Sequence, residues 1–229
     1  MKINGLQKTT LLDYPGKVAC TLFTPGCNFR CPFCHNAGLV LGGEGETLSE
    51  SEILRFLEKR KGILEGVCVT GGEPLLQPDI GDFLAKVKAL GLSVKLDTNG
   101  SFPARLKSLV SAGVVDYVAM DIKNSPAKYA QTVGVPNFDL APVRESVEFL
   151  KQGALPFEFR TTVVRELHEA EDFEEIGRWI QGAPQYYLQN FTDSGELLSP
   201  GLSAHPAERL KSFAAIAEKY VKKVGVRGI

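Results

Sequence analysis

The sequence of 229 residues lacks several features that would assign it to a membrane or to a polyanion. No uncharged apolar run is long enough to cross a bilayer. The opening stretch MKINGLQKTTLLDYPGK has no sustained apolar segment and no small-residue cleavage site, so we expect no secretory signal. The formal net charge is −1, which provides no global positive field to attract nucleic acid or acidic lipid. We therefore expect a cytoplasmic protein that binds neither nucleic acid nor membranes.

Cysteine is also scarce, but it is not evenly spread. Three of the five cysteines fall within the stretch GCNFRCPFCHN, as Cys27, Cys31 and Cys34 in the spacing C-x3-C-x2-C. An odd number with three clustered thiols argues against a disulfide framework and favours metal or redox chemistry. A structural zinc site needs four ligands, usually as two separated pairs. Three thiolates suit a [4Fe-4S] cluster with one iron left open for a substrate or cofactor, because full ligation takes four cysteines.

The two remaining cysteines, Cys20 and Cys68, lie within apolar runs of β type, and we expect them to be small buried hydrophobic residues. The alternative to the cluster is a zinc knuckle completed by His35 or by a carboxylate. His35 adjoins Cys34 too closely to complete a tetrahedron comfortably. A non-catalytic zinc-binding module nevertheless remains a function of another class.

The fold prediction comes from alternation along the chain. Short β-type runs alternate with amphipathic helical stretches, and no proline-rich linker or run of like charges divides them. Six strand–helix alternations imply parallel strands with right-handed crossovers. A full eight-unit barrel usually needs about 250 residues, so we predict one α/β domain over 1–229, a partial, laterally open (β/α)6 barrel. The expected strands are 18–24, 66–71, 93–98, 117–123, 157–164 and 185–191. The expected helices are 50–62, 80–90, 104–113, 126–134, 139–152, 170–181 and 205–223.

Unusual residue groups follow the predicted strands. The cysteine loop follows the first strand, and residues 71–74, which begin with two glycines, follow the second. Residues 97–100 and 121–123 end the third and fourth strands with a carboxylate each. In barrels of this kind the chemistry lies at the carboxyl ends of the strands. We therefore expect these groups to gather at one rim.

The cysteine spacing, with Phe33 before the last cysteine, resembles the signature of the radical S-adenosylmethionine (SAM) superfamily. The longer string CNFRCPFCHN is similar to the activating enzymes of glycyl-radical proteins, such as pyruvate formate-lyase activases. The opening GLQKTTLLDYPGKVACTLFTPGCNFRCPFCHN most resembles activating proteins of anaerobic ribonucleoside-triphosphate reductases, and the similarity runs through the sixth strand. This resemblance implies a [4Fe-4S] cluster on the three cysteines, with SAM bound to the open iron and cleaved reductively to a 5′-deoxyadenosyl radical.

The resemblance also implies the partners. A glycyl-radical enzyme would be the protein substrate, losing a hydrogen atom from one glycine. No further cysteine set follows Cys34, so we count one cluster, and an external donor such as flavodoxin or ferredoxin would supply the electron. A second hypothesis keeps the radical chemistry but takes a small molecule as substrate, in cofactor or modified-base synthesis.

Several cofactor contacts follow from the same resemblance. Gly71, Gly72 and Glu73 match the GGEP element, in which paired glycines let the backbone approach a ligand and the glutamate accepts a hydrogen bond from the SAM ammonium. Lys123 matches a residue that contacts the SAM carboxylate. The full set of implied cofactor contacts is Phe33, Cys34, His35, Gly71, Gly72, Glu73, Thr98, Asp121, Lys123, Arg160 and Phe191.

The strand-end carboxylates have two interpretations. By resemblance Asp97, Thr98 and Asp121 hold a monovalent cation beside the SAM carboxylate, and oxygen ligands suit such a hard ion. The alternative is that the two carboxylates pair with Lys95 and Lys123.

Arg160 lies inside a predicted buried strand, where its charge is costly unless paired. Its partner would be either a SAM carboxylate or an acid such as Glu158. His168 and His205 are expected to be solvated residues near helix starts.

The sequence departs from the family pattern in two places. After the sixth strand the activases carry a histidine near the SAM adenosine, whereas this chain has Asn190 and Phe191, and Phe191 is able to stack on adenine. The familiar DGPG near the N-terminus reads DYPG here, and Tyr14 lacks the freedom of glycine at positive φ.

Overall fold

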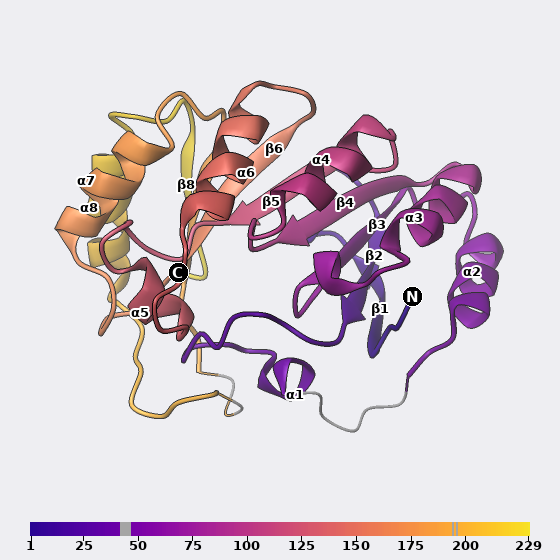
Figure 1. Cartoon of the computed structure of the whole chain (residues 1–229), viewed down its shortest axis with the longest axis horizontal. Helices are drawn as coiled ribbons and strands as arrows, with labels where there is room; N and C mark the ends of the chain where they lie inside the picture. The colour runs from indigo at the N-terminus through magenta and orange to yellow at the C-terminus, as the bar shows by residue number, and fades with distance from the viewer. Residues whose placement is uncertain (42–46, 194, 196) are drawn as a thin grey trace. The chain divides into compact units, whose positions relative to one another are not determined.

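The computed structural model of the chain describes residues 1–41, 47–193, 195 and 197–229. The strands form one open sheet in which β1 to β8 follow one another in chain order (Figure 1). This confirms the predicted open α/β sheet of parallel strands. The chain divides into two compact units. The first unit comprises Met1–Asn28, Gly38–Thr98 and Phe102–Val118, and the second comprises Phe29–Ala37, Asn99–Ser101 and Ala119–Ile229.

The sheet of the first unit is parallel except at its edge. Strands β2 (Ala19–Thr24), β3 (Gly66–Gly71) and β4 (Ser93–Thr98) pair in parallel, whereas β1 (Gly5–Thr10) is antiparallel to β2. The middle strands are buried over most of their length, as expected for strands covered on both faces. Strand β1 was not predicted, because its residues GLQKTT are mostly polar and largely exposed.

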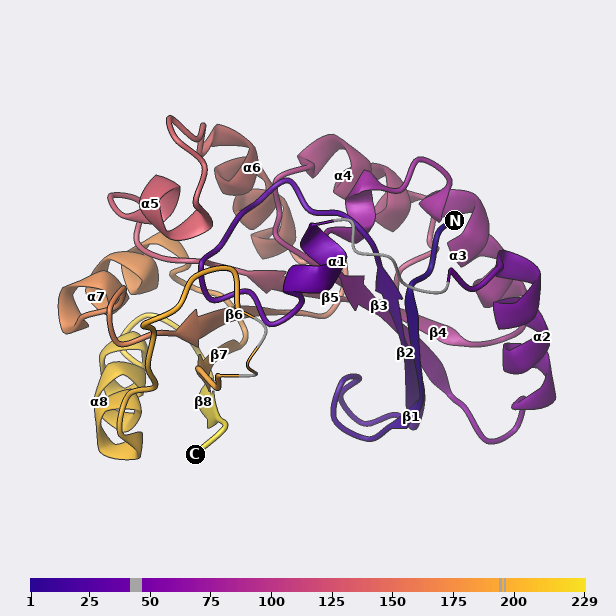
Figure 2. The same ribbon diagram turned by 90° about the horizontal axis from the view of Figure 1, so that it is seen from below.

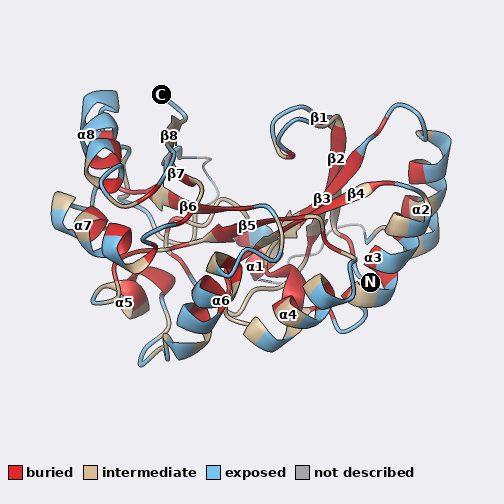
Figure 3. Cartoon of the chain, turned by 90° about the horizontal axis from the view of Figure 1, so that it is seen from above, coloured by how far each residue is buried: buried red, intermediate tan, exposed pale blue. Residues whose placement is uncertain are grey.

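Amphipathic helices cover this sheet. Helix α2 begins at the predicted capping box, in which Ser49 and Glu52 each accept a hydrogen bond from the other's backbone. Figure 3 shows α2 and α3 with buried residues on one side and exposed residues on the other. The helices of this part of the chain are α1 (Ala37–Val40), α2 (Glu50–Lys59), η1 (Pro74–Leu76), α3 (Ile80–Ala89) and α4 (Pro103–Ser111).

The DYPG departure has a structural explanation in the first unit. The backbone N–H of Lys17 donates to the carbonyl of Tyr14 at 3.2 Å, and Gly16 takes the positive φ of this turn, +73°. The Tyr14 ring is buried, with its centroid 6.1 Å from that of Tyr117. A Cβ on Gly66 would lie 2.9 Å from the Tyr14 ring, so the tyrosine fills space that a glycine at position 66 leaves. The turn therefore needs glycine at position 16 and not at position 14.

The second unit has its own parallel strands and helices. Strand β5 (Tyr117–Asp121) ends two residues earlier than predicted, and its last three residues belong to this unit. Figure 2 shows α8 beside β8, and α8 packs against β7 and β8 and against α7. The remaining strands are β6 (Phe157–Val163), β7 (Tyr186–Asn190) and β8 (Val224–Arg227), paired in parallel. The helices are α5 (Tyr129–Val133), α6 (Ala141–Lys151), α7 (Ala170–Trp179) and α8 (Ala207–Ala217).

The last helix was predicted too long. It ends at Ala217 and not at 223, and the chain then forms β8, which the sequence did not reveal. Arg227 of β8 lies 3.7 Å from the ring centroid of Tyr187 and bonds both carboxylate oxygens of Glu158. Over the part of the chain that is described, no helix combines the length and apolar character needed to span a bilayer.

Candidate functional site

The clustered cysteines lie on an irregular loop between β2 and α1. All three are reduced thiols; Cys31 is buried, and the other two are half-buried. Within the second unit the backbone N–H of Cys34 donates to the carbonyl of Cys31 at 3.1 Å, so these two residues share one turn. Arg30 N–H bonds to the carbonyl of Val133 at 2.8 Å and anchors that turn to α5. Soft sulfur donors on an anchored loop suit an iron–sulfur cluster.

The other two cysteines are confirmed as core residues. Cys20 and Cys68 are buried on β2 and β3. Burial raises the pKa of the Cys20 thiol to about 12, so it stays protonated and is a poor metal ligand.

In the first unit, the glycine pair after β3 lies directly against the start of the cysteine loop. Gly72 N–H donates to the carbonyl of Thr24, and Glu73 N–H donates to that of Gly26, both at 2.8 Å. A Cβ on Gly72 would lie 1.9 Å from the Gly26 carbonyl oxygen. Gly71 has a φ of +112°, which glycine accepts without strain. The GGEP element therefore brings two backbone segments closer than side chains would permit.

Glu73 is 0% exposed and is held by hydrogen bonds. Its Oε1 accepts from the Thr98 hydroxyl at 2.8 Å and from the Leu75 N–H at 3.1 Å. Two residues predicted separately as cofactor contacts are thus directly connected. Asp97, on the same strand as Thr98, pairs with Lys95, which is 1% exposed and lies 3.7 Å from the Cys68 sulfur. The structure therefore shows Asp97 paired with Lys95, as the alternative to a cation site expected.

In the second unit, Asp121 lies between two cations at the end of β5. Its Oδ2 is 2.9 Å from Lys123 Nζ, and its Oδ1 is 3.0 Å from Arg160 Nε. Burial alone would raise the pKa of Asp121, but the charges of Arg160 and Lys123 outweigh it and lower the pKa to about 2. Arg160 therefore pairs with an acid, as one interpretation expected, but the acid is Asp121, while Glu158 pairs with Arg227.

His35 and Phe191 meet in the second unit as well. Their ring centroids are 5.6 Å apart with an interplanar angle of 23°, and Phe191 is 2% exposed. Burial lowers the pKa of His35, and the charge of Lys123 lowers it further. Burial also acts to lower the pKa of Lys123, but Asp121 and then Cys31 outweigh it and raise that pKa. Five of the predicted cofactor contacts, His35, Asp121, Lys123, Arg160 and Phe191, are thus linked electrostatically or by stacking, and Lys123 is also coupled to the predicted cluster ligand Cys31. Phe33, a sixth, is buried in the same unit.

Asn190 stands where the activases carry a histidine. Its Nδ2 donates to the carbonyl of His205 at 3.2 Å. Its Oδ1 is buried and has no hydrogen-bond partner among the described residues. A buried acceptor without a donor is costly, and a ligand N–H at this position would satisfy it.

The prediction for His168 was wrong. It does directly precede the cap of α7, but it is 0% exposed, and its Nε2 lies 2.9 Å from the carbonyl oxygen of Lys123. His205 is half-buried near the start of α8, with its Nε2 3.1 Å from the carbonyl of His168. A histidine in the stretch ELHEAED carries no local signal of burial, because its partners come from distant segments.

Asp121→Asn should lower the free energy of unfolding at neutral pH by about 3 kcal/mol, because it leaves two cations without their shared acid. The pKa of Asp121 is lowered from 3.8 to about 2, so the carboxylate stabilises the fold above its ordinary value, and this contribution is lost as pH falls from about 4 to about 2. The difference between wild type and variant in urea unfolding should therefore shrink below pH 4. Glu148→Gln, which breaks the exposed pair with Lys151, is the control and should cost under about 0.5 kcal/mol. Equal effects of the two variants would contradict the pairing.

Comparison with known proteins shows the family of the chain. Residues 21–180 match the model of the radical SAM superfamily. A Methanocaldococcus jannaschii protein, provisionally named a glycyl-radical enzyme activating enzyme, is 30% identical over 99% of this chain and 96% of its own. The pyruvate formate-lyase-activating enzyme of Listeria monocytogenes is 28% identical over 80% of this chain and 77% of its own. A radical SAM methyltransferase from Sphaerobacter thermophilus has the same fold, with a TM-score of 0.71 at 14% identity over 94% of this chain and 68% of that chain.

The chain belongs to the radical SAM superfamily. It is therefore an enzyme whose family uses a [4Fe-4S] cluster and SAM, and the non-catalytic zinc module is excluded. The three loop thiols and the buried acceptor at Asn190 are compatible with these cofactors.

Proposed function

We propose that this protein is an activating enzyme that removes a hydrogen atom from one glycine of a partner glycyl-radical enzyme. The observation that carries the proposal is similarity along almost the whole length of both chains to the Methanocaldococcus jannaschii protein, with the Listeria activase as a second relative over 80% of this chain. The partner is either an anaerobic ribonucleotide reductase or a pyruvate formate-lyase, the two groups that the N-terminal stretch resembles.

The residues have separate roles in this proposal. Cys27, Cys31 and Cys34 are the residues that would hold the [4Fe-4S] cluster. When bound and given one electron by an external donor, the cluster and SAM would supply the radical that accepts the hydrogen atom from the glycine. Lys123 offers its ammonium to the SAM carboxylate, and Asp121 keeps that ammonium charged and directed.

The glycine-rich elements serve binding and exclusion of water. Gly71 and Gly72 keep the loop after β3 against the cysteine loop, and the buried Glu73 accepts hydrogen bonds from Thr98 and Leu75.

The Phe191 and His35 rings form an apolar, uncharged surface beside Lys123, because the pKa of His35 is lowered. Excluding water strengthens the electrostatic interactions inside a site, so these two rings would favour the binding of the SAM carboxylate to Lys123.

The test mixes anaerobically reconstituted protein with SAM, a reductant and each candidate partner. We expect a glycine-centred paramagnetic signal on one partner, together with one 5′-deoxyadenosine for each glycyl radical, because the hydrogen lost by the glycine appears in that product. A partner whose radical glycine is replaced by alanine should give no signal. Release of 5′-deoxyadenosine without a signal on any partner would instead support a small-molecule substrate.

A further inference from the structure

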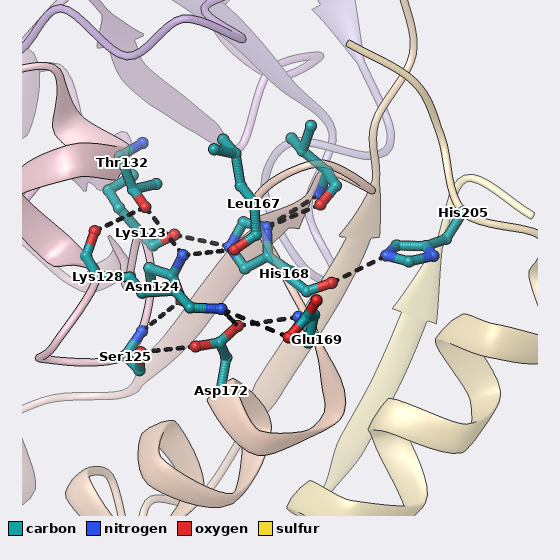
Figure 4. Close-up of polar contacts among 11 residues, drawn as sticks. Lys123, Asn124, Ser125, Lys128, Thr132, Leu167, His168, Glu169, Asp172 and His205 are labelled. Atoms are coloured by element: carbon teal, nitrogen blue, oxygen red, sulfur yellow. Dashed lines mark hydrogen bonds and ion pairs between the residues drawn. The ribbon is translucent and has the colours of Figure 1, made fainter.

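Two segments of the second unit that are distant in sequence are joined by partly buried hydrogen bonds (Figure 4). One is the stretch after β5, residues 123–128, and the other is the turn after β6, residues 164–168. His168 Nε2 meets the carbonyl oxygen of Lys123 at 2.9 Å. In return, Asn124 Nδ2 donates to the carbonyl of Leu167 at 3.0 Å. The turn 164–168 therefore binds both the backbone of Lys123 and the side chain of Asn124.

The protonation of His168 follows from its partners. The Lys123 carbonyl can only accept, so the proton must be on Nε2. The other ring nitrogen, Nδ1, then accepts from the Val164 N–H at 3.1 Å and also lies 3.2 Å from the Val164 carbonyl oxygen. Burial lowers the pKa of His168 despite the hydrogen bonds to Lys123 and Val164, which keeps the ring neutral with one donor and one acceptor. Both ring nitrogens are thus used within the protein.

Further contacts fix the same two segments from the side of α7. Asp172 Oδ1 accepts from the Ser125 hydroxyl at 2.8 Å, and its Oδ2 is 2.7 Å from Lys128 Nζ. The Glu169 N–H also donates to Asp172 Oδ2, at 2.9 Å, as part of the helix cap. Asn124 Nδ2 reaches the Thr132 hydroxyl at 2.9 Å as well. The stretch after β5 is therefore held at three successive residues, 123, 124 and 125.

We propose that His168 is a positioning residue that fixes the backbone of Lys123, so that the lysine ammonium is presented to the carboxylate of SAM. The inference rests on the proposed role of Lys123 in SAM binding. A lysine side chain has about four rotatable bonds, so its ammonium group keeps one position only if both the backbone and the ammonium group are held. Asp121 holds the ammonium group, and His168 holds the backbone.

Two substitutions distinguish the contributions of the two ring nitrogens of His168. A glutamine amide at position 168 places its N–H₂ where Nε2 lies and keeps the donor to Lys123. An asparagine reaches only as far as Nδ1, so it keeps the acceptor for Val164 and loses the donor. We therefore expect His168→Gln to retain SAM affinity and His168→Asn to weaken it by about tenfold, a loss typical of an outer partner of a ligand-binding residue.

The measurement is equilibrium dialysis of SAM against the cluster-loaded protein. A second readout needs no cofactor, since amide hydrogen exchange of residues 122–128 in the unloaded protein should speed up in His168→Asn but not in His168→Gln. Arg165→Ala, an exposed change on the same turn, is the control and should alter neither. If His168→Asn does not fold, His168→Gln decides, because loss of SAM affinity in that variant overturns the proposal.

A double-mutant cycle tests whether His168 acts through Lys123. On a Lys123→Met background, His168→Asn should no longer affect SAM affinity. An undiminished effect, or equal SAM affinities of the two His168 variants, would overturn the proposal. Because SAM binding needs no partner protein, failure to activate a glycyl-radical enzyme would refute the proposed function and leave this inference unaffected.

Discussion

Replacing Cys31 by alanine should abolish cluster assembly and SAM cleavage, the largest effect we expect from any single substitution. Cys31 is the most buried of the three clustered cysteines at 7% exposure, and it shares a turn with Cys34. Two remaining thiolates cannot hold a [4Fe-4S] cluster that normally uses three or four. Iron and sulfide per chain should fall to near zero after anaerobic reconstitution, and no 5′-deoxyadenosine should form with SAM and reductant.

The matched control is Cys20→Ala. Cys20 is buried on β2, and its raised pKa keeps it from acting as a thiolate ligand. Its replacement should leave iron and sulfide content unchanged and cost only the packing of one small side chain, about 1 kcal/mol. Iron retained in Cys31→Ala, or lost in Cys20→Ala, would show that the cluster ligands were assigned to the wrong cysteines.

The parallel core was predictable because its signal is local and strong. The runs VACTLFT and GVCVTG are almost continuously apolar or β-branched, SVKLDT alternates polar and apolar residues, and a helix follows each run along the chain. The edge strands β1 and β8 were missed for the opposite reason. Residues 5–10 are mostly polar, and residues 224–227 follow a lysine-rich segment after α8 and contain a glycine. Edge strands depend on pairing with a neighbour more than on their own composition.

The residues of the candidate site also divide into those that the sequence indicates and contacts that only the fold reveals. The cysteine loop, GGEP and the strand-end carboxylates were found because each is a short motif. The hydrogen bond between Glu73 and Thr98 joins residues 25 positions apart, and the pair of Asp121 with Arg160 joins residues 39 apart. His168 bonds Lys123 across 45 positions. No spacing rule in a single sequence indicates such long-range polar contacts, so second partners of site residues emerge only from the fold.

Gly72→Ala is the second substitution with a large expected effect. The added Cβ would lie 1.9 Å from the Gly26 carbonyl oxygen and 2.6 Å from its carbon, and both are backbone atoms that cannot rotate away. The two loops would have to separate, weakening the hydrogen bonds from Gly72 to Thr24 and from Glu73 to Gly26. Overpacking together with these losses should lower the free energy of unfolding by about 3 kcal/mol, as measured by urea denaturation.

Gly38→Ala separates this close approach from a general effect of losing a glycine. Gly38 lies in α1, where an added Cβ would meet no side chain or distant backbone atom within 4 Å, and its φ is not positive. Alanine there should be neutral or stabilise the protein by at most about 1 kcal/mol. Because Gly72 lies against the loop that carries Cys27, Gly72→Ala should also reduce iron incorporation, whereas Gly38→Ala should not. Wild-type stability and iron content in Gly72→Ala would mean that the loops after β2 and β3 do not meet backbone to backbone.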